Sequence, residues 1–249
     1  MQTKLIALPN GLPAAQNVAK LLSSQIVGQL HIGARLPSES ELASQFEVSR
    51  VTVREALKIL AGQGIVSLSR GRRATVRQPD GAMFDAFLRS LIHSDPRSAF
   101  DLMHVRRALE VQAVTLACRN ASRSGLFAVD AALVAMRQAA EAMPEDGSDE
   151  AGGRAFDLAD VQFHQAMALA GGNRVLTFLF EAMEGALLEV FEGSRRGAQR
   201  SQAALIANCE EHRAILDHVR ARDEMTAAEA MLALITRAEA NLRSALGNN

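Results

Sequence analysis

The chain has 249 residues, of which 48% are apolar, and a formal net charge of −1. This apolar content argues for a folded globular protein and against disorder, and the length favours two domains. No apolar run approaches the roughly 18–20 residues that a membrane-spanning helix needs. The first 16 residues contain one lysine and a very short apolar segment, a poor signal peptide, and two isolated cysteines fit a reducing compartment. We expect a cytoplasmic protein that does not enter a membrane.

The small net charge conceals an uneven distribution. Residues 1–77 carry ten Lys and Arg against four Glu, a balance of +6, whereas the remainder carries 17 basic and 24 acidic residues, a balance of −7. A small basic module joined to a larger acidic one indicates that only the first binds a polyanion. The alternative interpretation is a chance segregation of surface charge.

Two helices are predicted before residue 49. Apolar residues recur at helical spacing over 18–30, and Gly33 ends this first unit. Ser38 and Glu41 have the S-x-x-E spacing of a capping box, which predicts the start of a short helix over 38–45.

The third predicted helix, 49–64, reads SRVTVREALKILAGQG and has two distinct faces. One face is apolar, and the adjacent sector carries a basic side chain at every fourth position. Such a helix is either amphipathic with a solvated basic edge or a recognition helix, which buries one face and presents donors to DNA. Ser49 is its expected N-cap. The apolar face consists of Val53, Ala56, Leu57 and Leu60, and the basic sector of Arg50, Arg54 and Lys58.

A β-hairpin is predicted after this helix. In IVSLSRGRRATVRQP, apolar and polar residues alternate on both sides of Arg70 and Gly71. The glycine permits close approach of the backbone to a groove, and Arg72 and Arg73 follow it. The order helix, helix, turn, longer helix and hairpin is typical of a winged helix-turn-helix, which we expect over 1–78.

After a linker over 79–82, the sequence shows only helical periodicity. An acidic, Gly-containing loop is expected over 144–153, and Thr226 with Glu229 predicts a capping box for the last helix. The protein is therefore expected to be mostly α, with an antiparallel all-helical bundle of about seven helices over 83–249. The predicted helices are 83–93, 97–122, 124–143, 154–170, 173–193, 201–221 and 226–246.

Polar side chains fall on otherwise apolar faces of three of these helices. Asp160 and His164 are four residues apart on one helix, so their side chains point the same way. His212 lies on the apolar face of a second helix, and Arg106 and Glu110 share the apolar face of a third. A carboxylate or an imidazole on such a face suggests a buried, paired site.

These residues allow two interpretations. Asp160, His164 and His212 could ligate a divalent transition metal ion of the zinc or nickel type, with water or a ligand completing the shell. Alternatively, Asp160 and His164 form a hydrogen-bonded core pair, and His212 is an ordinary core histidine. Arg106 needs an anion inside a bundle, which is either Glu110 or a small carboxylate effector.

The stretch GARLPSESELASQFEVSRVTVREALKILAGQGIV closely resembles the DNA-binding domain of the GntR family of bacterial transcriptional regulators. The match extends over some 60 residues and includes LPSE, VSR and VREAL. In the fatty-acid-responsive (FadR-type) branch, the resemblance implies DNA contacts from the N-terminal part of the third helix and from the hairpin tip. Many members have arginine where this chain has Ser40. The expected DNA-binding residues are Ser49, Arg50, Thr52, Arg54, Lys58, Arg70, Gly71 and Arg72.

Residues 83–249 resemble the effector-binding and dimerisation (FCD) domain of the same branch. Its pattern is R-x3-E, D-x3-H followed by Gly-Asn, and two later histidines. The last histidine of the pattern falls on Leu234, so the usual four metal ligands are reduced to three candidates. The resemblance implies effector binding by Arg106, Glu110, Asp160, His164 and His212, with a possible metal ion at Asp160, His164 and His212.

The favoured function is a ligand-responsive transcriptional regulator and not an enzyme. A homodimer would bind a palindromic double-stranded operator, and a small organic acid would release it, which makes the protein a repressor. One alternative is a metal-dependent enzyme that uses Asp160, His164 and His212 and has an accessory DNA-binding module. Another is an architectural DNA-binding protein, although a purely structural bundle has no need of a buried arginine and histidines.

Overall fold

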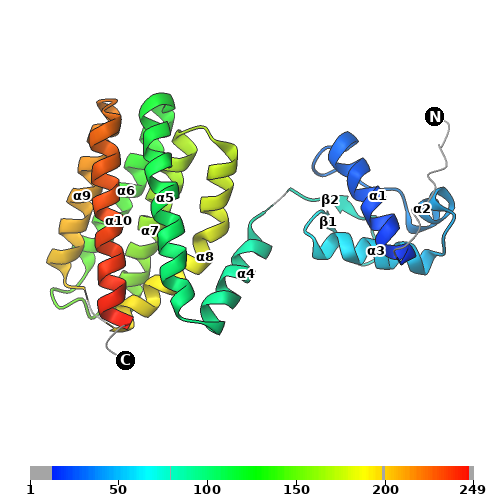
Figure 1. The fold of residues 1–249 in the computed structure, drawn as a ribbon, viewed down its shortest axis with the longest axis horizontal. Helices are drawn as coiled ribbons and strands as arrows, with labels where there is room; N and C mark the ends of the chain where they lie inside the picture. Colours follow the sequence, from blue (N-terminus) through cyan, green and yellow to red (C-terminus); the bar gives the residue numbers. More distant parts are fainter. Residues whose placement is uncertain (1–12, 79, 198–199, 247–249) are drawn as a thin grey trace. The chain divides into compact units, whose positions relative to one another are not determined.

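The computed structural model describes residues 13–78, 80–197 and 200–246, and it divides into two compact units, Met1–Met83 and Phe84–Asn249 (Figure 1). Residues 1–12, within the stretch judged a poor signal peptide, and Pro79 of the expected linker lie outside the described residues. Among the described residues, no helix has both the length and the apolar character needed to cross a membrane.

The first unit is a winged helix-turn-helix, as the sequence predicted. Its two short strands pair antiparallel, with Val66 opposite Val76. A segment that the sequence did not assign also joins them, because Arg35 forms a β-bridge with Thr75. The elements are α1 (Ala14–Gln29), α2 (Glu39–Phe46), α3 (Arg50–Gly62), β1 (Val66–Ser67) and β2 (Thr75–Val76).

Local sequence signals explain where these helices begin. The Ser38 side chain accepts from the backbone of Glu41, and the Glu41 carboxylate accepts from the backbone of Ser38, which is a complete capping box. Ser49 caps α3 by accepting from the backbone N–H of Thr52 at 3.0 Å. The predicted apolar face of α3 is buried in the core of this unit and consists of Val53, Ala56, Leu57 and Leu60.

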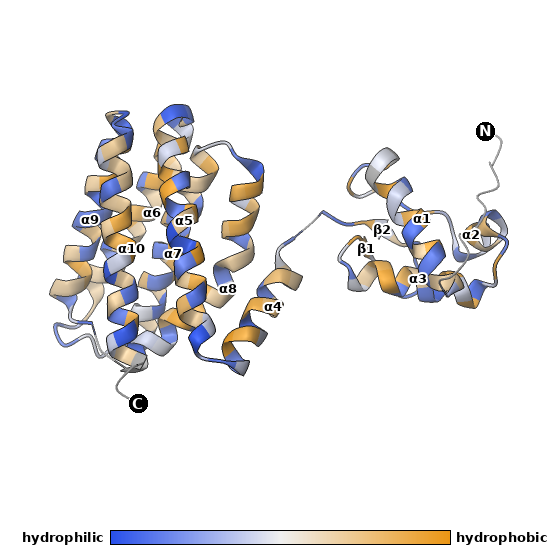
Figure 2. Cartoon of the chain, viewed as in Figure 1, coloured by the Kyte–Doolittle hydropathy of each residue, from blue (hydrophilic) through white to orange (hydrophobic). Residues whose placement is uncertain are grey.

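The second unit is helical, and its described residues form seven helices, in agreement with the prediction. The apolar faces shown in orange in Figure 2 meet in one core, and α7 packs on α5, α6 and α8. Helix α5 also contacts α9 and packs extensively on α10. The helices are α4 (Ala82–Ser94), α5 (Arg97–Asn120), α6 (Arg123–Ala142), α7 (Glu150–Ala170), α8 (Arg174–Gly197), α9 (Gln202–Arg220) and α10 (Glu224–Leu246).

Several helix boundaries differ from the prediction by a few residues, including the start of α1 at Ala14 and three boundaries in the second unit. Helix α7 begins at Glu150, inside the expected loop, because Asp149 caps it by accepting from the backbone of Ala151. Helix α10 begins at Glu224, because Asp223, and not Thr226, supplies the cap. Helix α8 continues beyond residue 193. Helices α7 and α10 each begin after an aspartate that accepts from one of their first backbone N–H groups. Helix α8 continues because nothing interrupts it at residue 193.

Candidate functional site

The polar residues predicted on apolar faces come together inside the second unit. Helix α5 supplies Arg106 and Glu110, α7 supplies Asp160 and His164, and α9 supplies His212. Four of them are buried, with exposed fractions of 0–2%, and the Asp160 side chain is 14% exposed. The long-range packing of α5 on α7 and α9 therefore assembles a site from segments about 50 residues apart in the chain.

Glu110 links the arginine to one of the histidines. The Arg106 Nε donates to Oε1 of Glu110 at 2.9 Å, and Nδ1 of His164 lies 2.7 Å from Oε2 of the same carboxylate. A second guanidinium nitrogen of Arg106 is 3.5 Å from Asp160. The hydrogen-bonded pair considered for Asp160 and His164 is not formed, because Nε2 of His164 is 3.9 Å from Asp160 and its Nδ1 is bonded to Glu110.

Both imidazoles are oriented by a hydrogen bond at Nδ1. An ionised carboxylate and a backbone carbonyl only accept, so Nδ1 of His164 donates to Glu110 and Nδ1 of His212 donates to the Asn208 carbonyl at 2.8 Å. In the neutral form of either ring, the lone pair is then at Nε2. These two nitrogens lie 3.3 Å apart, and Oδ1 of Asp160 is 3.1 Å from Nε2 of His212. Three acceptor atoms therefore converge on one point.

This donor set fits a metal ion. One proton can satisfy only one contact of the three, whereas a cation between the atoms satisfies all of them. Metal bonds of about 2.0–2.2 Å place tetrahedral ligand atoms about 3.4 Å apart, close to the observed 3.1, 3.3 and 3.9 Å. A carboxylate that holds the far nitrogen of a ligating histidine, as Glu110 does, is the usual partner of a metal-binding imidazole. Asp160, His164 and His212 could thus hold a metal ion.

The electrostatics favour the metal-binding forms of the two carboxylates and of His164. Burial raises the pKa of the Asp160 carboxyl, but His212, His164 and Arg106 outweigh burial, and the net pKa lies below its usual range. Burial likewise opposes ionisation of Glu110, and His164 and Arg106 again lower its pKa overall. The pKa of His164 is lowered, chiefly by burial, against the nearby carboxylates. Anionic carboxylates and a neutral imidazole are the forms that bind metals.

The cluster opens into a cavity of about 550 Å³. Asp160, His164 and His212 all line it, so an exogenous group can reach the three converging atoms. Leu234, at the position of the expected fourth histidine, is buried in the same wall and offers no ligand atom. An incomplete protein shell beside a cavity is the arrangement of an open metal site, in which a small molecule or water takes the remaining positions.

The predicted DNA-binding residues lie on exposed surfaces of the first unit. Arg50, Arg54 and Lys58 are exposed on α3, while Ser49 and Thr52 form its capped N-terminus. Arg70 and Arg72 are exposed at the hairpin tip, where Gly71 has a φ of +71°. Such a left-handed conformation favours glycine and leaves the backbone accessible.

Several residues at the exposed surface of the first unit and at the cavity of the second were not predicted from the sequence. Glu39 accepts two hydrogen bonds from Arg54, at 3.1 and 2.7 Å, and so holds this arginine against α2. Val51 is 66% exposed beside the basic sector of α3. In the second unit, Asp157 and Arg200 line the cavity. Only Val51 could have been suspected, from an apolar side chain outside the apolar face of the helix.

Comparison with known proteins identifies the architecture. A family model described as bacterial regulatory proteins, gntR family, matches residues 14–76, and a model described as the FCD domain matches residues 101–237. This chain belongs to the GntR family and carries an FCD domain. The GntR family consists of transcriptional regulators and not of enzymes, as the sequence predicted, and the metal-type cluster lies within the FCD domain.

Similar proteins include regulators and a solved structure. The HTH-type transcriptional regulator LutR of Bacillus subtilis (strain 168) is 30% identical over 213 residues, which are 85% of this chain and 93% of LutR. The galactonate operon transcriptional repressor of Escherichia coli (strain K12) is 28% identical over 227 residues, 89% of this chain and 93% of that protein. The structure of Streptococcus agalactiae GntR has a TM-score of 0.68 and 25% identity, over 90% of this chain and 98% of that one.

The buried ion pairs of Arg106 lead to a stability prediction. The variant Arg106→Ala leaves two carboxylates without their guanidinium, so we expect it to lower the free energy of unfolding by about 3–5 kcal/mol. Urea denaturation followed by circular dichroism measures this change. Adding Glu110→Gln should restore part of the loss, because a neutral amide needs no cation. Arg137→Ala, which breaks exposed ion pairs, should cost less than about 1 kcal/mol; an equal loss in both single variants would contradict the prediction.

Proposed function

We propose that this GntR-family protein is a repressor that binds a palindromic operator as a homodimer and leaves it when a small organic acid enters the FCD cavity. The open Asp160, His164 and His212 cluster beside the cavity carries this proposal, because a regulator that only bound DNA would not need it. The similarity to a repressor named for a galactonate operon supports an acid effector and negative control. The protein would act in the cytoplasm, where its operator lies.

The operator test uses the intergenic DNA upstream of the protein's own gene. The full chain should retard this fragment in a gel shift, and L-lactate, galactonate or succinate should release it. Tighter DNA binding with the acid would indicate an activator, and no binding to this or neighbouring promoter fragments would reject the proposed regulation.

The DNA interface would consist of the α3 N-terminus and the hairpin tip. Arg50 and Arg54 can bind guanine edges through two hydrogen bonds, while Lys58 and the hydroxyls of Ser49 and Thr52 suit phosphates. Arg70, Gly71 and Arg72 would contact the adjacent groove or backbone. The pairing of Arg54 with Glu39 is exposed and therefore weak, so DNA can displace it.

A dimer brings two recognition helices to the half-sites of one palindrome. Apolar side chains remain exposed on one face of α4, where Phe84, Phe87 and Leu91 are 39%, 56% and 41% exposed. Their i, i+3, i+7 spacing forms a stripe that a second copy of the chain could bury.

The variant Arg54→Ala tests the recognition helix. Loss of a base contact should weaken operator binding by about 1–3 kcal/mol and relax the sequence preference. A gel-shift titration at fixed salt concentration measures both effects. Lys20→Ala, which removes one exposed positive charge from α1 of the same unit, is the control and should bind nearly as wild type. Equal affinities of the Arg54 variant and the wild type would reject the assignment of α3.

The effector site would combine the cavity wall with a metal ion. Asp160, His164 and His212 would hold a divalent ion of the zinc or nickel type, which would supply a Lewis-acidic contact for the oxygens of the acid. Glu110 orients His164 for this role, and Arg106 adds positive charge at the same end of the cavity while it holds Glu110 and Asp160 in place.

Metal analysis tests this part of the proposal. The purified protein, dialysed after exposure to Zn²⁺ or Ni²⁺, should retain about one equivalent, measured by elemental analysis. The variant His212→Ala should lose it, and Glu110→Gln should weaken binding roughly 10- to 100-fold, because it alters the partner of a ligating imidazole. His218→Ala on the same helix is the control and should retain the metal. Retention by the His212 variant would contradict the assignment.

Helix α8 would transmit occupancy of the cavity to the DNA-binding unit. Its residues Val190 and Phe191 line the cavity. Its Glu189 accepts from Arg89 of α4 at 2.9 Å, and the backbone N–H of Ala186 donates to Asp85 of α4 at 2.8 Å. Because α4 follows the DNA-binding unit in the chain, an effector that favours one position of α8 also favours one position of α4.

The variant Gly185→Ala tests this transmission. A Cβ atom at Gly185 would lie 2.6–2.7 Å from the carboxylate oxygens of Asp85, so this side chain must move and its hydrogen bond from the Ala186 backbone, which ties α4 to α8, is disrupted. We expect the variant to bind the releasing acid as wild type does, by calorimetry, but to lose acid-induced release in the gel shift. Gly193→Ala in the same helix meets nothing within 4 Å and is the matched control. Normal release by the Gly185 variant would reject the route through α8 and α4.

A further inference from the structure

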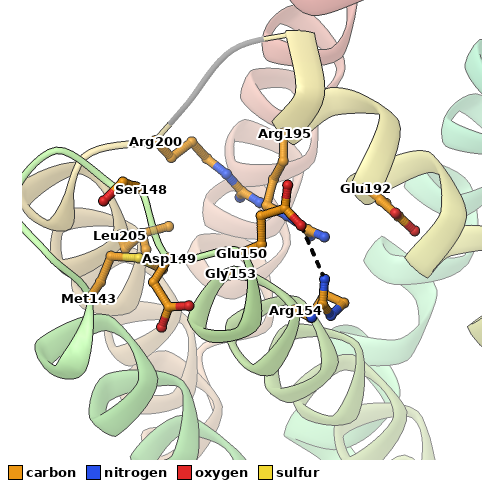
Figure 3. A pocket seen from close by; sticks show the side chains of 11 residues that line it. Met143, Ser148, Asp149, Glu150, Gly153, Arg154, Glu192, Arg195, Arg200 and Leu205 are labelled. Carbon is orange, nitrogen blue, oxygen red and sulfur yellow. Dashed lines mark ion pairs between the residues drawn. The ribbon is translucent and has the colours of Figure 1, made fainter.

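Arg200 is a cationic group that lines the cavity in addition to Arg106. Arg200, just before α9, lines the 550 Å³ cavity together with Asp160, and it also lines a neighbouring cavity of about 470 Å³. Figure 3 shows the neighbouring cavity, where Arg200 and Arg195 lie close together above α7. The Arg200 side chain is 34% exposed, whereas that of Arg106 is 2% exposed. Arg200 is therefore the more accessible of the two arginines.

Arg200 shares its internal partner with another arginine. The buried carboxylate of Asp157 accepts from Arg200 at 2.6 Å on one oxygen and pairs with Arg195 through the other. Arg195 is fixed by close packing on Gly153, where a Cβ atom would lie 3.0 Å from the arginine Cδ. If Arg200 turned to another anion, Asp157 would keep Arg195 and would not become an unpaired buried charge.

The same exchange is not available to Arg106. Its guanidinium is enclosed and contacts both Glu110 and Asp160, and each of these carboxylates also contacts a histidine. Withdrawing Arg106 toward a ligand would remove the guanidinium that Glu110 and Asp160 both contact. Of these two arginines, Arg200 is thus the one that can exchange its internal carboxylate for a ligand at a small cost in stability.

The separation between Arg200 and the Asp160 end of the cavity sets the length of a ligand that could reach both. Asp157, which holds Arg200, precedes Asp160 by three residues on α7, a rise of about 4.5 Å. A molecule with one anionic group at the Asp160 end and another at Arg200 therefore needs a short chain between them. A dicarboxylate with four or five carbons has this shape.

The summed charge of the cavity wall, together with a bound divalent ion, would match a ligand that carries two negative charges. Arg106, Arg200 and Arg237 are balanced by Asp157, Asp160 and Glu211 among the residues that line the cavity. The charges of Arg195 and Glu110, which pair with these lining residues, also cancel each other. A divalent ion bound at Asp160, His164 and His212 would then add two positive charges, which two carboxylates would neutralise.

We propose that Arg200 recognises the second carboxylate of a short dicarboxylate effector, whose first carboxylate lies at the Asp160, His164 and His212 end of the cavity. In this exchange Arg200 leaves Asp157 for the ligand, and Asp157 remains paired with Arg195. The inference rests on the proposed acid-responsive function and specifies the class of acid.

Calorimetry with the Zn²⁺-loaded full chain tests the inference with matched acids. Succinate should bind more tightly than butyrate, which has the same chain length and one carboxylate. The variant Arg200→Gln should weaken succinate binding roughly 10- to 100-fold and leave any butyrate binding unchanged, because only a charge-assisted contact is removed. Arg137→Gln, at an exposed ion pair outside the cavity, is the control for a general change of charge.

A second variant gives an effect of opposite sign. Asp157→Asn removes the internal competitor for Arg200, so succinate should bind more tightly than to wild type, with Zn²⁺ content and the circular dichroism spectrum as controls for the fold. A structural role alone would make both variants bind more weakly, which would overturn the inference. Equal binding of succinate and butyrate, in wild type and Arg200→Gln alike, would overturn it while leaving an acid effector in place. Binding of no acid of any type, including L-lactate and galactonate, would overturn both proposals.

Discussion

The effector domain depends on one buried carboxylate, that of Glu110. Its two oxygens accept from Arg106 of the same helix and from His164 of α7, and its side chain is completely enclosed. A carboxylate without partners in such a place would destabilise the fold by several kcal/mol. The same contact that makes its burial tolerable turns the His164 ring so that Nε2 faces Asp160 and His212. Stability and ligand geometry therefore share one interaction.

This arrangement leaves the cluster open toward the cavity and not closed by packing. The fourth position is occupied by Leu234, so the protein supplies three ligand atoms and the cavity supplies the space for the rest. A closed set of four protein ligands would stabilise the domain but would leave less room for an exogenous oxygen. Helix α8 contributes both to the wall of that cavity and to the contacts that hold α4, and the proposed transmission depends on this double role.

The DNA-binding unit and the effector domain differ in how far sequence alone describes them. In the first unit, the starts of α2 and α3, the capping box at Ser38 and the buried face of α3 follow from contacts within a few residues and were predicted, whereas α1 begins at Ala14 and not at residue 18. The exposed basic face was also predicted, since exposure requires only that nothing covers it. The pairing of Arg54 with Glu39 was not, because it joins two helices whose angle depends on the packing of the whole unit.

Local periodicity and short motifs were enough to predict the family, the order of the helices and four of the buried polar residues, Arg106, Glu110, His164 and His212, whereas the burial of Asp157 was not predicted. The pairing of the buried side chains depends on the tertiary structure: Glu110 pairs with His164, Asp160 with His212, and Asp157 with two arginines. Spacing on one helix favoured Asp160 with His164, but an i, i+4 neighbour shares only a face. A hydrogen bond also needs a direction, and the packing of α5 and α9 against α7 sets the direction of each imidazole.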